Sequence, residues 1–199
     1  VKIYLMFLER KMRKKLSLFI ISLILMLQCT LSFGAVNALA AGGVTVRDSA
    51  GNSLFSAVIE NADATAALES AFHYVQKNAD SNHRLTVRLS AGSYKITKGV
   101  VLRSYCTLDL QDVTLYNACI GPGNIFISPN ENRTGQVYTA YDALTDFTML
   151  GGTLDYAAEN WGESCLMRLA HCRNITVQKV EFLNNRNSHM VEIAACKNT

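Results

Sequence analysis

The sequence predicts an all-β fold, a right-handed parallel β-helix with an N-terminal capping helix, and two observations predict it. Residues 165–174 (CLMRLAHCRN) match residues 189–198 (HMVEIAACKN) position by position, at one constant offset. The segment between them, NITVQKVEFLNN, has the pattern of two earlier segments, DFTMLGGTLDY and TLDLQDVTLYN. Repeats of about 20 to 50 residues with short β-branched strands are typical of solenoids, in which each repeat buries its apolar side chains against the next.

Residues 1–40 have the pattern of a secretory signal peptide. Basic residues at positions 11–15 precede an uncharged apolar run over 16–27, and small residues at 38–40 suit cleavage. A membrane anchor needs about 20 apolar residues, and Gln28 interrupts the run before that length. A lipid anchor at Cys29 is disfavoured because the bulky Gln28 precedes it. Residues 1–11 are interpreted as an upstream extension, with Met12 as an alternative start.

We therefore expect two parts, a signal peptide with its extension over 1–40 and the N-terminal part of a β-helix domain over 41–199. This organisation predicts a protein that is secreted or displayed at the cell surface, with a bacterial-type signal and no stable membrane insertion after cleavage. Residues 41–199 carry 13 basic and 15 acidic side chains, so the net charge of +3 becomes about −2. The basic character belongs to the export signal, and no nucleic-acid partner is expected.

Five cysteines remain after residue 40, and their spacing fits neither a metal site nor a dense disulfide framework. We expect no metal and no cofactor. One interpretation makes these cysteines small buried hydrophobic residues of the solenoid core. The other is a disulfide between Cys172 and Cys196, which the constant offset of the repeat would place one strand spacing apart, within disulfide reach.

A helix is predicted over about 63–78, and β-structure follows it. Asp63 or Thr65 can cap this helix, whose apolar residues recur at helical spacing from Ala67 to Val75. From about residue 85 to 199 the apolar period changes to two, in strands of three to five residues separated by polar corners. We expect this helix to cover the first open turn of the solenoid. Two short strands are predicted between residues 41 and 61.

Residues 129–144 interrupt the repeat. They have no sustained period, and they make the repeat from Leu108 to Phe147 longer than the next one, from Phe147 to Ile175. Insertions of this kind in solenoids form loops on one face, which is often the binding face.

The order of these segments resembles a known family. The predicted helix, LTVRLSAGSYKI, VVLRSYCTLDLQDVTLY and FTMLGGTLDY resemble the N-terminal part of the pectate-lyase-like right-handed parallel β-helix superfamily. That group includes pectate lyases and family 28 polygalacturonases. The resemblance covers residues 61–199 and implies a secreted protein that acts on, or binds, acidic polysaccharide. The polygalacturonase motifs NTD, DD, GHG and RIK are absent from the sequence, as are the arginine motifs of pectate lyases, so the resemblance assigns no catalytic centre.

Strand parity selects a candidate site on the outer surface. If Met167 and Leu169 point into the core, Arg168 and Glu192 point out of the same sheet, one repeat apart. One interpretation of this arrangement is a surface ion pair without a function. The other is a binding site for a sugar on the outer face of one sheet. The residues for proton transfer are His189 and Glu192, and those for binding a uronate sugar are Arg168, Trp161, Glu163 and Asn185.

Three functions fit the sequence. The first is a carbohydrate-active enzyme, a glycoside hydrolase or polysaccharide lyase acting on pectin-like polysaccharide, although the chain contains neither catalytic constellation in full. The second is a noncatalytic glycan-binding or adhesion β-helix. The third is an inactive, truncated fragment. The absence of a second cap after the last strand, residues 190–194, predicts an open edge there and hence self-association of residues 41–199.

Overall fold

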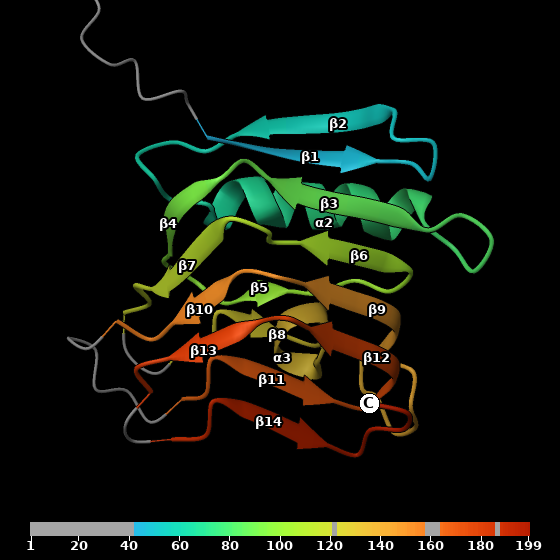
Figure 1. Cartoon of the computed structure of the whole chain (residues 1–199). Helices are drawn as coiled ribbons and strands as arrows, with labels where there is room; N and C mark the ends of the chain where they lie inside the picture. Colours follow the sequence, from blue (N-terminus) through green and yellow to red (C-terminus); the bar gives the residue numbers. More distant parts are fainter. Residues whose placement is uncertain (1–41, 121–122, 158–163, 186–187) are drawn as a thin grey trace, which may run out of the picture. The chain divides into compact units, whose positions relative to one another are not determined.

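The computed structural model describes residues 42–120, 123–157, 164–185 and 188–199. Residues Ala41–Thr199 form one compact unit (Figure 1). The predictions for the signal peptide fall on residues 1–40, outside the described ranges. The same holds for two of the candidate sugar-binding residues, Trp161 and Glu163.

The strands of the described residues form three sheets. Sheet A has the order β12-β9-β6-β3-β1-β2, sheet B the order β13-β10-β7-β4, and sheet C the order β14-β11-β8-β5. The strands of sheet A are β1 (Gly43–Arg47), β2 (Ser53–Val58), β3 (Leu85–Leu89), β6 (Cys106–Asp109), β9 (Leu144–Leu150) and β12 (Cys172–Gln178). Those of sheet B are β4 (Gly92–Ile96), β7 (Val113–Asn117), β10 (Thr153–Asp155) and β13 (Glu181–Leu183). Those of sheet C are β5 (Val100–Val101), β8 (Phe126–Ile127), β11 (Met167–Ala170) and β14 (Val191–Ala194).

From β3 onward the chain visits the three sheets in turn. Each set of consecutive strands, such as β9, β10 and β11, forms one tier, and each strand pairs in parallel with its counterpart in the next tier. The register of β11 with β14 pairs Met167 with Val191, Arg168 with Glu192 and Leu169 with Ile193. The constant offset read from the sequence is therefore the register of these two strands.

The predicted fold class is nevertheless wrong. Strand β1 runs antiparallel to both of its neighbours, β2 and β3, so the largest sheet is mixed. Two helices, α2 (Thr65–Asn78) and α3 (Glu131–Thr134), also lie within the described residues. The correct class is a mostly-β fold with one mixed sheet, two parallel sheets and few helices, in place of an all-β right-handed parallel β-helix. Alternating apolar residues predicted the strands, but they carry no information on strand direction.

Helix α2 packs its apolar face on β1, β2, β3 and β5. Its buried apolar residues are Ala67, Leu68, Ala71, Phe72 and Val75. The N-cap residue Ala64 offers no side-chain cap, and the preceding Asp63 instead accepts the backbone N–H of Thr65 (Oδ1···N 3.0 Å). The helix starts at Thr65, two residues after the predicted boundary, because Asp63 precedes the first turn and only accepts a hydrogen bond from it.

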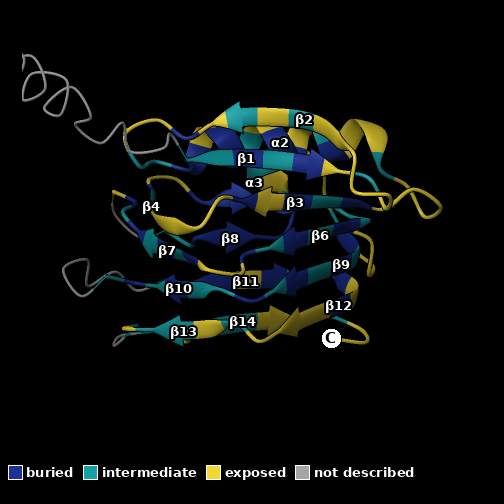
Figure 2. Ribbon diagram, turned by 45° about the horizontal axis from the view of Figure 1, so that its top comes forward, coloured by how far each residue is buried: buried dark blue, intermediate teal, exposed yellow. Residues whose placement is uncertain are grey.

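The core lies between the three sheets and thins toward the last tier. Figure 2 shows β8 buried throughout and β6 and β9 with buried and intermediate residues only, whereas β12, β13 and β14 are mostly exposed or intermediate. Ile193 is aligned with the fully buried Leu169 but is 55% exposed. Core-facing positions of the last tier thus lack a covering layer in the described structure.

Two glycines make the corner between β9 and β10. Gly151 and Gly152 have φ values of 68° and 81°, in the left-handed region that favours glycine. A Cβ on Gly152 would lie 2.5 Å from both the Cβ and the carbonyl oxygen of Leu110 in the neighbouring tier. The GGT sequence therefore allows successive tiers to approach closely at this corner.

Candidate functional site

The candidate site is centred on an ion pair on the outer face of sheet C. Arg168 on β11 faces Glu192 on β14, with Nε and Oε1 3.2 Å apart, and their side chains are 55% and 40% exposed. The neighbouring residues Met167 and Leu169 are buried, so the strand turns its polar side chain outward. The predicted contact between the two charged residues is confirmed.

The same outward column continues into earlier tiers with apolar residues. Val101 on β5 is aligned with Ile127 on β8, and Ile127 is aligned with Arg168. Val101 and Ile127 are only 9% and 8% exposed. The outer face of sheet C is therefore covered at its first two strands and open at its last two.

The segment between β8 and β9 is anchored next to the start of β5. Asn130 caps α3 by accepting the backbone N–H of Arg133 (3.2 Å), and Gly135 ends the helix in the left-handed region. Arg133 donates from Nη2 to the carbonyl of Gly99 (2.6 Å), just before β5, and lies 3.8 Å from Glu69 on α2. The insertion predicted as a loop is thus anchored to the start of sheet C, and it contains a short helix that the sequence interpretation missed.

Glu192 has a second neighbour that sequence reasoning missed. The thiol of Cys165 lies 3.9 Å from Glu192 Oε2, and Asn124 donates to both the carbonyl (2.6 Å) and the sulfur (3.1 Å) of Cys165. Burial, followed by the nearby Glu192 carboxylate, raises the pKa of the Cys165 thiol. The thiol therefore stays protonated at neutral pH and acts as a weak donor toward the carboxylate.

Asn185 has a structural task in this region. Its side-chain amide donates to the carbonyls of Ser164 (3.0 Å) and His189 (2.8 Å). These bonds connect the turn that leads into β14 with the turn that leads into β11. Asn185 Oδ1 is buried and has no hydrogen-bond partner in the described structure. Asn185 thus holds the backbone of these two turns in place. Its contact with a sugar stays a prediction.

His189 lies just before β14 and is exposed. Among the described residues, its carbonyl is fixed by Asn185, but no hydrogen bond or ion pair joins its imidazole to Arg168 or Glu192. The structure therefore brings together Arg168 and Glu192, and it uses Asn185 to hold the backbone of Ser164 and His189.

A separate cleft of about 570 Å³ opens between the end of β2, the first turns of α2 and the end of β4. Its charged lining residues are Glu60, Asp63, Glu69, Lys95 and Lys98. Lys98 is engaged with Glu69 at 3.2 Å. Two separate stretches of the chain, residues 57–70 and 95–98, form this cleft, so no local pattern predicted it.

The carboxylate of Asp63 lines that cleft and is held by hydrogen bonds. It accepts hydrogen bonds from the backbone N–H of Thr65 (3.0 Å) and from the hydroxyl of Thr97 (2.9 Å). Desolvation raises the pKa of Asp63, but the hydrogen bonds from Thr65 and Thr97 outweigh it, so the net pKa lies below the ordinary value of 3.8. These bonds fix the carboxylate to the helix start, which is a structural use of the residue.

Among residues 42–120, 123–157, 164–185 and 188–199, no cluster of three or more His, Cys, Asp or Glu side chains is arranged to hold a metal ion. The helices in these ranges are too short or too polar to cross a bilayer.

No model of a known protein family matches the sequence, and no curated protein does either. The chain is similar to a solved structure, that of a putative glycosyl hydrolase from Parabacteroides merdae, with 11% sequence identity. That alignment covers 67% of this chain and 89% of the other and has a TM-score of 0.35. A likeness at this level carries no argument about fold or activity.

Proposed function

We propose that the protein is a carbohydrate-active protein that binds an acidic polysaccharide on the outer face of β11 and β14. The observation that carries this proposal is the exposed Arg168–Glu192 pair, located where the outer face of sheet C changes from covered apolar side chains to open charged ones. The guanidinium of Arg168 favours a polymer that carries carboxylates, so uronate polymers are the proposed substrate class.

The chemistry follows from the two charges. A guanidinium binds a carboxylate through two parallel N–H donors, so Arg168 can exchange its partner Glu192 for a uronate carboxylate. Glu192, freed by that exchange, is then a base next to the bound sugar. A lyase needs a base beside a cation that holds the uronate, and this arrangement supplies both, with His189 as a second candidate for proton transfer.

The alternative is a glycan-binding protein without catalysis. It is favoured by the contacts of Glu192, whose side-chain partners within the described residues are Arg168 and Cys165, with no second carboxylate. Glycoside hydrolysis needs two carboxyl groups about 5 to 10 Å apart. Secretion or display at the cell surface belongs to the same proposal and is supported by the signal-like pattern of residues 1–40.

The test is binding of polygalacturonate and of uncharged galactan to the full chain, measured by affinity electrophoresis. We expect binding to the acidic polymer alone and an affinity loss of about tenfold or more in Arg168→Ala, because a charge-assisted hydrogen-bond pair contributes about 1.5 to 3 kcal/mol. The matched control is Arg88→Ala, which removes the equivalent cross-strand ion pair with Asp109 (3.7 Å) on sheet A.

Product analysis separates the enzymatic and binding alternatives. Unsaturated uronate ends indicate a lyase, new reducing ends without unsaturation indicate a hydrolase, and unchanged polymer with retained binding indicates a noncatalytic protein. The proposal fails if the protein binds neither polymer, or if Arg88→Ala and Arg168→Ala weaken binding equally.

A further inference from the structure

Cys172 and Cys196 lie opposite each other on adjacent parallel segments. Lys197 donates its backbone N–H to the carbonyl of Cys172 (2.9 Å), and its carbonyl accepts the N–H of Asn174 (3.1 Å). This pattern places residue 197 opposite Arg173. The residues one position earlier, the two cysteines, are therefore also opposite each other. Adjacent strands are about 4.8 Å apart, which lies within the Cα separations that disulfides allow.

The two thiols also have the same orientation. The sulfur of Cys172 contacts the carbonyl oxygen of Ala170 (3.1 Å), and the sulfur of Cys196 contacts that of Ala194 (3.3 Å). In each case the carbonyl lies two residues before the cysteine. The sulfur of Cys196 additionally reaches the carbonyl of Leu169 in the preceding tier (3.6 Å). The Cys196 side chain is thus directed toward the tier that contains Cys172.

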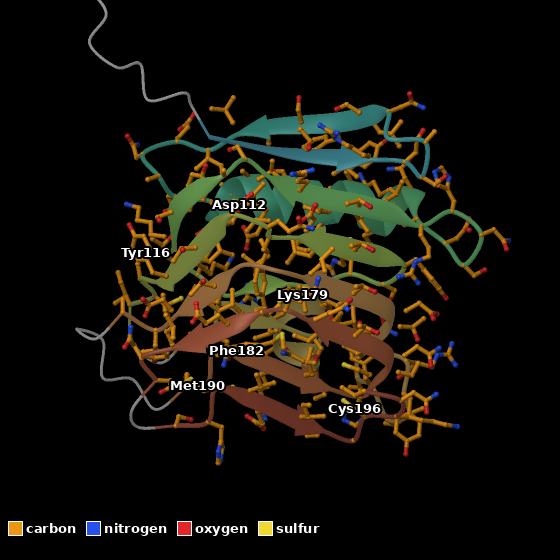
Figure 3. All side chains as sticks on the ribbon, in the orientation of Figure 1. Asp112, Tyr116, Lys179, Phe182, Met190 and Cys196 are labelled. Carbon is orange, nitrogen blue, oxygen red and sulfur yellow. The ribbon has the colours of Figure 1, made fainter. Side chains whose placement is uncertain are left out.

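The two thiols differ in access. Cys172 is buried, whereas Cys196 is half-buried at the end of the last tier, where Figure 3 labels it. Desolvation, followed by the proximity of Cys196, raises the pKa of Cys172 to about 12. A small oxidant therefore reaches Cys196 first, and Cys172 is positioned to resolve the product.

We propose that Cys172 and Cys196 are a disulfide-forming site that links the last tier to the one before it when the protein meets a small disulfide such as oxidised glutathione. The Cys196 thiolate attacks one glutathione sulfur and releases one glutathione thiolate, which leaves a mixed disulfide on Cys196. The Cys172 thiolate then attacks the Cys196 sulfur and releases the second glutathione. Two protein thiols are oxidised, one external disulfide is reduced, and the two protons pass to the released thiolates.

Cys106 provides a matched control. Cys106 is buried like Cys172 but its neighbours in the adjoining strands are Leu85 and Phe147, so it has no cysteine opposite it. Oxidation should therefore leave Cys106 as a free thiol. This site is independent of the proposed polysaccharide function, because it rests on strand register and on the orientation and burial of the two thiols.

The experiment incubates the reduced full chain with oxidised glutathione, blocks free thiols, digests with trypsin and maps the peptides by mass spectrometry. We expect the peptide over residues 169–173 linked to the peptide over residues 187–197. Formation of this link should be about tenfold slower in urea, where the register is lost. The oxidised chain should melt about 5 to 15 °C higher than the reduced chain, as expected for a cross-link that closes a loop of this length.

Variants exclude a nonspecific effect. Cys196→Ser should abolish both the link and the gain in melting temperature, while Cys106→Ala should keep both at a lower starting stability. The proposal is overturned if Cys196 is recovered only as free thiol or as its glutathione adduct. It is also overturned if the link forms as fast in urea as in buffer, or if Cys172 is found linked to a different cysteine.

Discussion

Asn198 donates a hydrogen bond from its side-chain amide to the side-chain oxygen of Asn174 in the preceding tier (Nδ2···Oδ1 3.1 Å). Asn174 in turn donates to Asp146 in the tier before (3.1 Å). All three residues have φ between 51° and 54°. This side-chain ladder joins three successive tiers at one corner, and it ends on the carboxylate of Asp146.

The ladder predicts unequal effects of alanine at its two asparagines. Asn174→Ala removes two side-chain hydrogen bonds and places alanine in the left-handed region, so we expect a loss of about 2 to 3 kcal/mol in the free energy of unfolding. Asn198→Ala removes one such bond at an exposed position, with an expected loss of about 1 kcal/mol. Urea denaturation measures both. Asn174→Gly separates the two causes, because glycine tolerates the backbone; equal losses in all three variants would contradict the ladder.

The corner glycine predicts a steric effect. Gly152→Ala would put a Cβ 2.5 Å from Leu110 at a φ of 81°, so we expect a loss of at least about 3 kcal/mol in stability, measured by thermal and urea unfolding. The matched control is Gly51→Ala, at a φ of 86° with nothing within 4 Å of the added Cβ. The control carries only the backbone cost, about 1 to 2 kcal/mol. Similar losses in the two variants would show that tiers do not pack closely at Gly152.

Asp63 predicts a pH dependence of stability. Because its pKa is lower in the folded chain than its ordinary value of 3.8, its contribution is fully present above the unfolded pKa and is lost as the pH falls through the folded pKa. Asp63→Asn should therefore lower the melting temperature at pH 7, and the gap from the unsubstituted chain should close progressively below about pH 4. In a Thr97→Val background, which lacks one donor to Asp63, the gap should be smaller. A gap that is constant from pH 7 to pH 2 would exclude this role.

The ion pair predicts weak, salt-dependent coupling. A double-mutant cycle of Arg168→Ala and Glu192→Ala should give a coupling free energy of about 0 to 1 kcal/mol at low salt and less at 1 M salt, because both side chains are substantially exposed. Combined with the binding assay, this result would separate function from stability. A coupling well above the range of exposed ion pairs that persists at high salt would mark the pair as structural instead.

Local patterns in the sequence were sufficient for part of this structure. The register of β11 with β14 followed from the constant offset between two copies of the repeat. The outward position of Arg168 and Glu192 followed from the alternation of side chains along each strand. The antiparallel direction of β1 did not follow, because alternation predicts the buried face of a strand and not its partner.

The environment of the candidate site was less predictable. Asn185 is held by the carbonyls of Ser164 and His189, and backbone acceptors have no sequence signature. Helix α3 does have one, since Asn130 and Gly135 have the composition of an N-cap and a C-terminal glycine around one helical turn. Helix α3 was not predicted because residues 129–144 have no sustained apolar period. The burial of Val101 and Ile127 depends on tertiary packing, which local patterns do not record.

The last tier predicts self-association of residues 41–199. Ile193 is 55% exposed and Val177 is 37% exposed, although both are aligned with fully buried residues, Leu169 and Met149. Among the described residues, β13 and β14 are also the edges of their sheets, with unpaired backbone donors and acceptors, whereas β12 is paired with residues 197–198 only at its start. Figure 3 shows Phe182 and Met190 on this tier as well, and both are only partly buried. Sedimentation velocity should therefore reveal concentration-dependent oligomers at micromolar concentrations.

Charged substitutions at core-facing positions should reduce this association. We expect Ile193→Lys to shift the distribution toward monomer with little change in melting temperature, because an exposed side chain contributes little packing. Val137→Lys is the control, since Val137 is 61% exposed but belongs to the segment between β8 and β9 and to none of the strands of the last tier. If the unsubstituted unit sediments as a monomer up to about 100 μM, or if both variants reduce association equally, the exposed last tier is not the surface that joins the copies.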